Sequence, residues 1–173
     1  DACRSKIAVA ERVFRSRGAP LDLVLMDSGW SDPQSIMRIS RQRPDRLALM
    51  SQLTQEKLGC PLGLHVITSG VKTMVDKDWL AAQGYDMIYH RSQREGAYCV
   101  AAPRVLAEFR DNLVGYVRQY GIAAYKFDWG HFACAAANHR GHLPGEVYGF
   151  EAGAANFVAA QRAFREANPE IFL

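Results

Sequence analysis

Four segments of the chain carry apolar side chains at helical spacing, and each ends at a residue type that commonly terminates helices. In the third segment, for example, Leu106, Phe109, Leu113 and Tyr116 recur every three or four residues before Gly121. This spacing places apolar side chains on one face of a helix. Three segments end at glycine and the fourth at Asn168-Pro169, as helix C-termini do. The pattern therefore predicts amphipathic helices over residues 6–18, 45–59, 104–121 and 149–169.

A short apolar run follows each predicted helix within two to four residues. The runs are LDLVLMD at 21–27, LGLHVIT at 62–68, IAAYKFD at 122–128 and IFL at 171–173. Nearly continuous apolar strands that alternate with helices are typical of a parallel sheet covered by helices. Both a (β/α)8 barrel and a doubly wound sheet fit this pattern, and both carry function at the carboxyl ends of the strands.

The connections between these elements favour the barrel. The long loops, residues 28–45 and 69–103, follow strands, whereas the turns before strands are short. No strand is followed by either glycine-rich phosphate-binding motif. A complete barrel takes eight strands and typically about 250 residues. We therefore expect residues 1–173 to form an α/β fold that is roughly half of a (β/α)8 barrel, with about four parallel strands, outer helices, and the remaining half of its own barrel as partner.

Composition and charge narrow the function classes. The net charge of +3 is mild, and the basic run at 38–46 lacks interleaved aromatic residues, which argues against a nucleic-acid partner. No apolar stretch approaches the roughly 20 residues of a membrane span, so no membrane partner is expected. The four cysteines, Cys3, Cys60, Cys99 and Cys134, are widely spaced and contain no CxxC motif. We interpret them as buried or free thiols that fit neither a zinc site nor a disulfide framework.

Polar side chains interrupt the predicted strands at their carboxyl ends. Lys126 and Asp128 stand two apart in an apolar, aromatic run and therefore share a face. Asp27 ends the first strand, and His65 lies in the second. Barrel enzymes collect their catalytic groups at these ends. A purely structural explanation remains open: Asp27 would cap the DSGW turn, and Asp128 would form a buried ion pair with Lys126.

The pair of Lys126 and Asp128 also suits one particular chemistry. A cation beside a carboxyl group lowers the carboxyl pKa, and an ionised, oriented carboxylate is what a glycosidase nucleophile must be. Trp30 and Trp129 come just beyond two of the strands. Their rings would either stack on a sugar or simply pack in the core, and we count both among the expected substrate contacts.

Three strand-end motifs occur in the order in which one enzyme group has them: LVLMDSGW, GLHV and YKFDWG. Together they resemble the clan of retaining α-galactosidases, glycoside hydrolase families 27 and 36, and its family 36-like members most. That clan has a DDGW-like turn, a GLW-like strand and a K-x-D strand. The resemblance extends through most of the chain, including the helix before YKFDWG and the ANPEIFL segment.

The resemblance implies roles for individual residues. Asp128 matches the nucleophile, Lys126 the sugar-contacting lysine, and Asp27 the first of two aspartates that bind sugar hydroxyls. Ser28 stands in place of the second aspartate, and His65 in place of a tryptophan. The general acid/base of the clan is an aspartate on a later strand, beyond Leu173. The resemblance thus implies a retaining hydrolase of α-linked sugars, with galactosides as the expected substrates and a carbohydrate as the ligand.

Two alternatives stay open. His131, His139 and His142 could form a metal-dependent hydrolase with Asp27 or Asp128, but the last two lie in a glycine- and proline-containing loop and match no helical metal motif. Loop histidines could equally line a sugar cleft, and we count His131 among the expected substrate contacts. The other alternative is a non-catalytic or degenerate carbohydrate-binding barrel, which Ser28 would suit. Nothing in the sequence calls for a metal or a cofactor.

Overall fold

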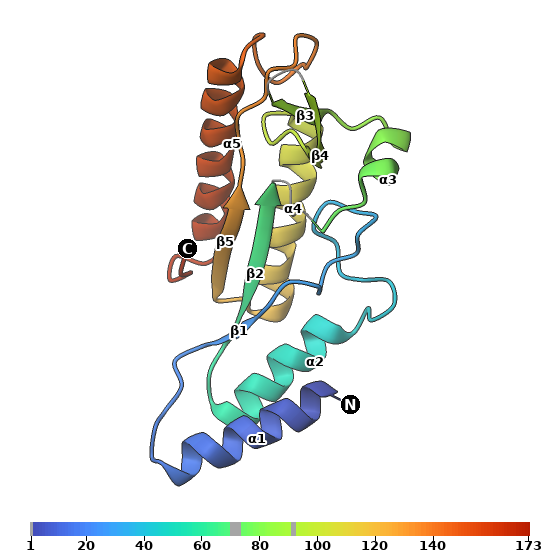
Figure 1. Cartoon of the computed structure of the whole chain (residues 1–173). Coiled ribbons are helices and arrows are strands. Elements are labelled where there is room, and N and C mark those ends of the chain that lie inside the picture. Colours follow the sequence, from blue (N-terminus) through green and yellow to red (C-terminus); the bar gives the residue numbers. More distant parts are fainter. Residues whose placement is uncertain (1, 70–73, 91–92) are drawn as a thin grey trace.

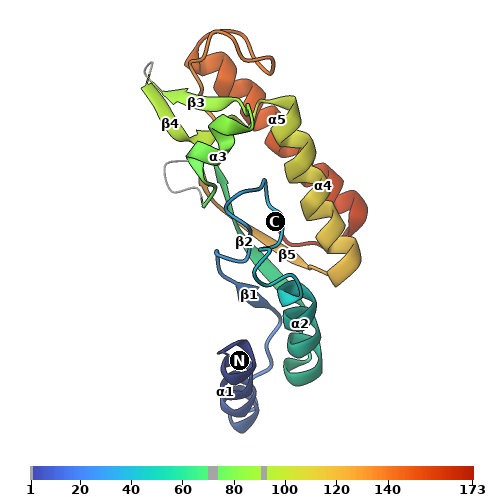
Figure 2. The same cartoon turned by 90° about the vertical axis from the view of Figure 1, so that its right-hand side faces the viewer.

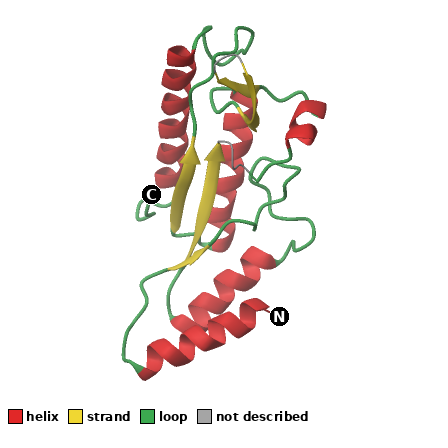
Figure 3. Cartoon of the chain, in the orientation of Figure 1, coloured by secondary structure: helices red, strands yellow, loops and turns green. Residues whose placement is uncertain are grey.

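The computed structural model describes residues 2–69, 74–90 and 93–173 and is a mixed α/β fold (Figures 1 and 3). A parallel sheet of three strands is accompanied by helices and by a separate antiparallel strand pair. No helix within the described residues has the length and apolar character needed to cross a membrane. The elements in chain order are α1 (Ala2–Ser16), β1 (Val24–Met26), α2 (Arg46–Leu53), η1 (Thr54–Leu58), β2 (Leu62–Ser69), α3 (Lys77–Ala82), β3 (Met87–His90), β4 (Gln93–Tyr98), α4 (Pro103–Tyr120), β5 (Ala124–Gly130) and α5 (Glu146–Ala167).

The four helices predicted from apolar spacing are all present as α1, α2 with η1, α4 and α5. The second departs from the expectation, because its last turn, η1, is a π-helix. Two of the predicted glycine terminators, Gly59 and Gly121, adopt left-handed backbone angles, with φ of 69° and 63°. A residue without a Cβ reaches this region at little cost, which is why glycine ends these helices.

The parallel sheet has the strand order β1-β2-β5. Phe172 then forms an isolated parallel bridge with Ala124 of β5. Of the four predicted strands, three are therefore present, and the fourth, residues 171–173, is reduced to this bridge. Each successive strand is added on the same side of the one before it, as in a barrel, whereas a doubly wound sheet reverses direction.

The long connection after β2 contains structure that the apolar pattern did not predict. It holds α3 and the antiparallel pair β3–β4, in which Met87 pairs with Tyr98. The pair lies toward the end of the molecule at which β2 and β5 finish (Figures 1 and 2). Its strands are short, and the two residues between them in the sequence, Arg91 and Ser92, are not an Asn-Gly or Asp-Gly pair, so the usual hairpin pattern is missing.

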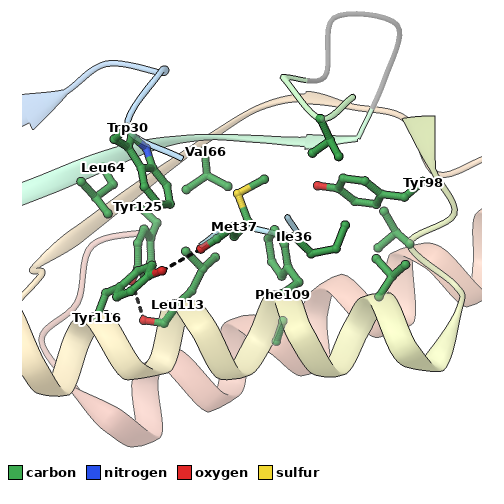
Figure 4. Close-up of a cluster of buried hydrophobic side chains, with 14 of the residues drawn as sticks. Trp30, Ile36, Met37, Leu64, Val66, Tyr98, Phe109, Leu113, Tyr116 and Tyr125 are labelled. Atoms are coloured by element: carbon green, nitrogen blue, oxygen red, sulfur yellow. Dashed lines mark hydrogen bonds between the residues drawn. The ribbon is translucent and has the colours of Figure 1, made fainter. Parts of the chain in front are cut away.

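The two faces of the parallel sheet differ sharply. One face carries the main core, in which sheet residues such as Leu64, Val66 and Tyr125 meet α4 (Figure 4). The loop after β1 enters the same core, where the Tyr116 hydroxyl donates to the Met37 carbonyl at 2.9 Å. The other face carries the charged residues at the strand ends. α4 and α5 thus lie on the apolar side of β2 and β5 (Figure 2), and the opposite side is available for chemistry.

Candidate functional site

Strand register brings the polar residues of three strands together. His65 of β2 is the register partner of Lys126 of β5, and Ile67 is the partner of Asp128. Met26 pairs with Leu64, so Asp27 follows β1 beside His65. Partner residues in parallel strands point to the same face. Asp27, His65, Lys126 and Asp128 therefore form one group on this face, which we call the strand-end quartet. Asp27 directly follows β1, whereas His65, Lys126 and Asp128 lie within β2 and β5.

The imidazole of His65 lies between the two carboxylates of the quartet and is hydrogen-bonded to Asp27. Its Nδ1 lies 2.6 Å from Asp27 Oδ1, and its Nε2 lies 3.4 Å from Asp128 Oδ2. An ionised carboxylate only accepts hydrogen bonds, so Nδ1 carries the hydrogen that it shares with Asp27. The hydrogen bond from His65, aided by the one from the Ser28 backbone N–H, lowers the pKa of Asp27 below its ordinary value. Lys126 completes the quartet, with Nζ 3.3 Å from Asp128 Oδ2.

The charged side chains of the quartet are open to solvent in this chain, whereas the His65 side chain is only 11% exposed. The side chain of Asp27 is 85% exposed, and those of Lys126 and Asp128 are 53% and 40% exposed. The sequence left open that Lys126 and Asp128 form a buried, purely structural ion pair. In this chain the pair is not buried. An ion pair with this exposure contributes at most about 1 kcal/mol to stability. The fold does not need these charges, although a ligand could use them.

Trp30 lies in the core instead of at the mouth of the site. Its side chain is 1% exposed, and its ring meets Tyr116 edge to face (Figure 4). The indole Nε1 donates to the backbone carbonyl of His65 at 2.9 Å. The expectation that Trp30 stacks on a sugar is therefore not supported. Its contact instead holds β2 at the residue that bridges Asp27 and Asp128.

The remaining predicted site residues lie around the same strand ends. Ser28 is exposed, and its backbone N–H donates to Asp27 Oδ1 at 2.7 Å. His131 is half-buried directly beyond β5. Trp129 belongs to β5, but its side chain lies outside the described part of the structure.

A buried carboxylate that the sequence did not reveal organises the loop after β1. Asp32 accepts hydrogen bonds from Arg41 Nε at 2.8 Å, from the Arg41 backbone N–H at 3.1 Å and from the Gln34 backbone N–H at 2.9 Å. The Arg41 hydrogen bond lowers the pKa of Asp32, although burial opposes it. Arg41, which belongs to the basic run at 38–46, therefore has a structural role in this loop. Arg41 fixes the segment that carries Trp30 and therefore supports His65.

His139 and His142 do not join the strand-end quartet. They meet Cys99 and Cys134 instead, and the four potential ligand atoms all lie within 4.8 Å of one another. The hydrogen bond between the two sulfurs lowers the pKa of the Cys134 thiol and raises that of Cys99. All four cysteines are free thiols, as the sequence indicated, but Cys99 and Cys134 lie side by side, which their spacing in the sequence did not reveal. A hydrolase that combines these histidines with Asp27 or Asp128 gains no support.

Comparison with known proteins identifies the fold. No protein-family model matches the chain, and no curated protein matches it. Among solved structures, it is similar to the glycoside hydrolase family 36 α-galactosidase AgaA from Geobacillus stearothermophilus, with a TM-score of 0.66 and 16% identity over 98% of this chain and 25% of that one. A variant of AgaA in complex with raffinose gives a TM-score of 0.68 at 15% identity, with the same coverage.

A second glycoside hydrolase family is also similar. The family 31 dextranase of Flavobacterium johnsoniae, complexed with glucose, gives a TM-score of 0.60 and 14% identity over 96% of this chain and 22% of that one. The chain thus spans about a quarter of the length of these solved structures. The structural neighbours are glycoside hydrolase barrel domains, and the chain has a glycosidase-like fold.

Proposed function

We propose that the chain is roughly half of the (β/α)8 catalytic barrel of a retaining glycoside hydrolase that acts on α-linked sugars, with α-galactosides as the first candidates. The observation that supports this most strongly is the strand-end quartet, in which two carboxylates, a lysine and a histidine from three adjacent strands form one connected group. The strand order and the likeness to glycoside hydrolase barrels support the same proposal.

In this proposal Asp128 is the nucleophile. Its carboxylate attacks the anomeric carbon, the glycosidic bond breaks, and a glycosyl-enzyme forms that water then hydrolyses. Lys126, 3.3 Å from Asp128 Oδ2, favours the ionised carboxylate and donates hydrogen bonds to the sugar. The acid/base that protonates the leaving group and later activates water comes from the other half of the barrel.

Asp27, Ser28, His65, Trp129 and His131 are proposed to contact the substrate. Asp27 accepts from His65 and from the Ser28 backbone N–H through Oδ1. Its second oxygen and its large exposure suit a sugar hydroxyl. Ser28 is neutral and shorter than a carboxylate, so it would bind a sugar hydroxyl less strongly than the aspartate of the resembled clan.

The test is the stereochemistry of turnover. The full-length protein is supplied with aryl α-galactoside, α-glucoside and α-xyloside, and the first sugar anomer released is followed by proton NMR. We expect hydrolysis of at least one of these with the α-anomer appearing first, because two displacements retain configuration. Release of the β-anomer first would contradict the double displacement at Asp128.

A non-catalytic carbohydrate-binding barrel is the second candidate, and Ser28 is the observation that favours it. The same preparation distinguishes the two functions. Saturable sugar binding by calorimetry, without turnover of any of the three glycosides, would support the binding protein and contradict the hydrolase.

A further inference from the structure

Two cysteines and two histidines meet at the end of the molecule where β3 and β4 lie. Cys99 directly follows β4, and Cys134, His139 and His142 come from the connection between β5 and α5. Both cysteines are fully buried. Their sulfurs and one ring nitrogen of each histidine lie within 4.8 Å of one another. We call these four residues the sulfur–imidazole cluster.

We propose that the sulfur–imidazole cluster is a structural zinc site. Two thiolates and two imidazoles form one of the standard tetrahedral ligand sets of Zn²⁺. Zinc with sulfur at about 2.3 Å and nitrogen at about 2.1 Å holds its ligand atoms about 3.4 to 3.8 Å apart in a tetrahedron. The separation of Cys134 Sγ and His139 Nδ1, 3.4 Å, lies within that range. All the other separations among the four ligand atoms are at most 4.8 Å, and zinc binding would draw the longer ones into this range.

Both histidines are already oriented as ligands. His142 Nδ1 lies 2.7 Å from the Leu143 carbonyl, which only accepts, so Nδ1 carries the hydrogen. His142 Nε2 is then the lone-pair nitrogen. It is buried and has no hydrogen-bond partner of normal geometry among the described residues. His139 turns Nδ1 to Cys134, and its Nε2 lies 3.9 Å from Asp86 Oδ1. Zinc-bound histidines typically donate a hydrogen bond from their second nitrogen to a carbonyl or a carboxylate. His142 already does so, and Asp86 is the carboxylate placed nearest to do the same for His139 after a small approach.

Glycines let the two segments of the cluster come close together. A Cβ at Gly141, between the two histidines, would overlap the Ala101 carbonyl beside Cys99. A Cβ at Gly149 of α5 would overlap the backbone of Cys134. The Tyr89 backbone N–H also points to Cys134 Sγ, at 3.5 Å. Backbone contacts of β3, α5 and the β5–α5 connection therefore keep the four ligand residues close together before any ion binds.

Charge balance and ligand number distinguish zinc from the alternatives. One Zn²⁺ with two thiolates and two neutral imidazoles is electrically neutral, which suits a buried site. A Cys99–Cys134 disulfide would leave the buried His142 Nε2 without a ligand or a hydrogen-bond partner. A catalytic zinc keeps an open position, whereas four protein ligands close the coordination shell. The site therefore serves the fold and links the β5–α5 connection to the end of β4.

The experiment measures metal in the full-length protein, purified without chelator, by plasma mass spectrometry. We expect about one zinc per chain, and a thiolate-to-cobalt charge-transfer band after exchange with Co²⁺. Cys134→Ser and His142→Ala should lose the bound zinc. Cys60→Ser, which changes another fully buried cysteine, is the matched control and should keep it. Asp86→Asn should weaken zinc affinity about 10-fold through His139.

The wild-type measurements keep the test decisive even if a variant fails to fold. Folded wild-type protein that holds no zinc and takes up neither Zn²⁺ nor Co²⁺ would overturn the proposal. A Cys99–Cys134 disulfide in peptide mapping of protein alkylated before reduction would also overturn it. Full zinc content in folded Cys134→Ser protein would contradict the proposal as well.

Discussion

The strand-end quartet and the sulfur–imidazole cluster are both groups of four polar side chains, but the fold treats them oppositely. The quartet stands on adjacent strands with its charges open to solvent. The cluster comes from connections between elements and has its two sulfurs completely buried. Exposed charges contribute little to stability, whereas buried polar groups must be satisfied within the protein. Substitutions in the quartet should therefore reduce activity more than stability, and substitutions in the cluster should reduce stability more than activity.

The largest effect is expected from Asp128→Asn, which keeps the shape of the side chain and removes the proposed nucleophile. We expect kcat to fall by at least about 1,000-fold. The free energy of unfolding should change by less than about 1 kcal/mol, because the ion pair with Lys126 is half-exposed. Glycosidase kinetics and thermal unfolding of the full-length protein measure both. Asp22→Asn, at the opposite end of β1, is the control and should keep its activity. A collapsed Tm, or full activity in folded protein, would contradict the nucleophile assignment.

Cys134→Ser should produce the opposite pattern. Losing a structural metal is among the few single changes that cost about 4 kcal/mol or more of folding stability. Denaturant unfolding should therefore show a large drop in midpoint for Cys134→Ser and little change for Cys60→Ser. Activity per folded molecule should fall far less than in Asp128→Asn. Equal stability of the two cysteine variants would contradict the prediction that Cys134 contributes more to stability than an ordinary buried thiol.

Asp27→Ala tests whether the exposed end of the quartet binds the sugar. We expect kcat/KM to fall by the equivalent of about 2–4 kcal/mol, because a charged hydrogen bond to the substrate is lost. Stability should barely change, since the side chain is 85% exposed. A companion variant, Ser28→Asp, should raise the preference for α-galactosides over other α-glycosides. Unchanged relative rates across the three substrates would argue against a specificity role for position 28.

Asp32→Asn falls between the two patterns, because Asp32 is buried but supports the quartet through the loop of Trp30. We expect a loss of about 1–3 kcal/mol of stability at pH 7. Arg41 lowers the pKa of Asp32 below 3.8 in the folded chain, so the carboxylate stabilises the protein above pH 3.8. This contribution disappears as the pH falls through the lowered pKa. Unfolding measured from pH 7 to pH 2 should show that the variant has lost this part of the acid dependence.

The sequence singled out all four members of the quartet, although it did not predict that His65 contacts both aspartates. Strands of period two in parallel register put Asp27, His65, Lys126 and Asp128 on one face, and apolar spacing predicted the helices that flank them. The cluster follows no such rule. Cys99 and Cys134 are brought together by the β3–β4 pair and the close packing at Gly141, neither of which has a local sequence pattern. The prediction that Trp30 contacts the sugar failed for a related reason. Its position just beyond β1 does not reveal whether the following loop folds into the core.

The most direct test of the central claim is to identify the atom that holds the sugar during turnover. The full-length protein is incubated with a fluorinated α-glycosyl donor whose glycosyl-enzyme hydrolyses slowly, and peptic peptides are sequenced by mass spectrometry. We predict one glycosyl group per chain, attached to the Asp128 carboxylate in the peptide YKFDWG. A glycosyl group attached to a different residue, or active enzyme that is never labelled, would contradict the assignment of Asp128 as the nucleophile.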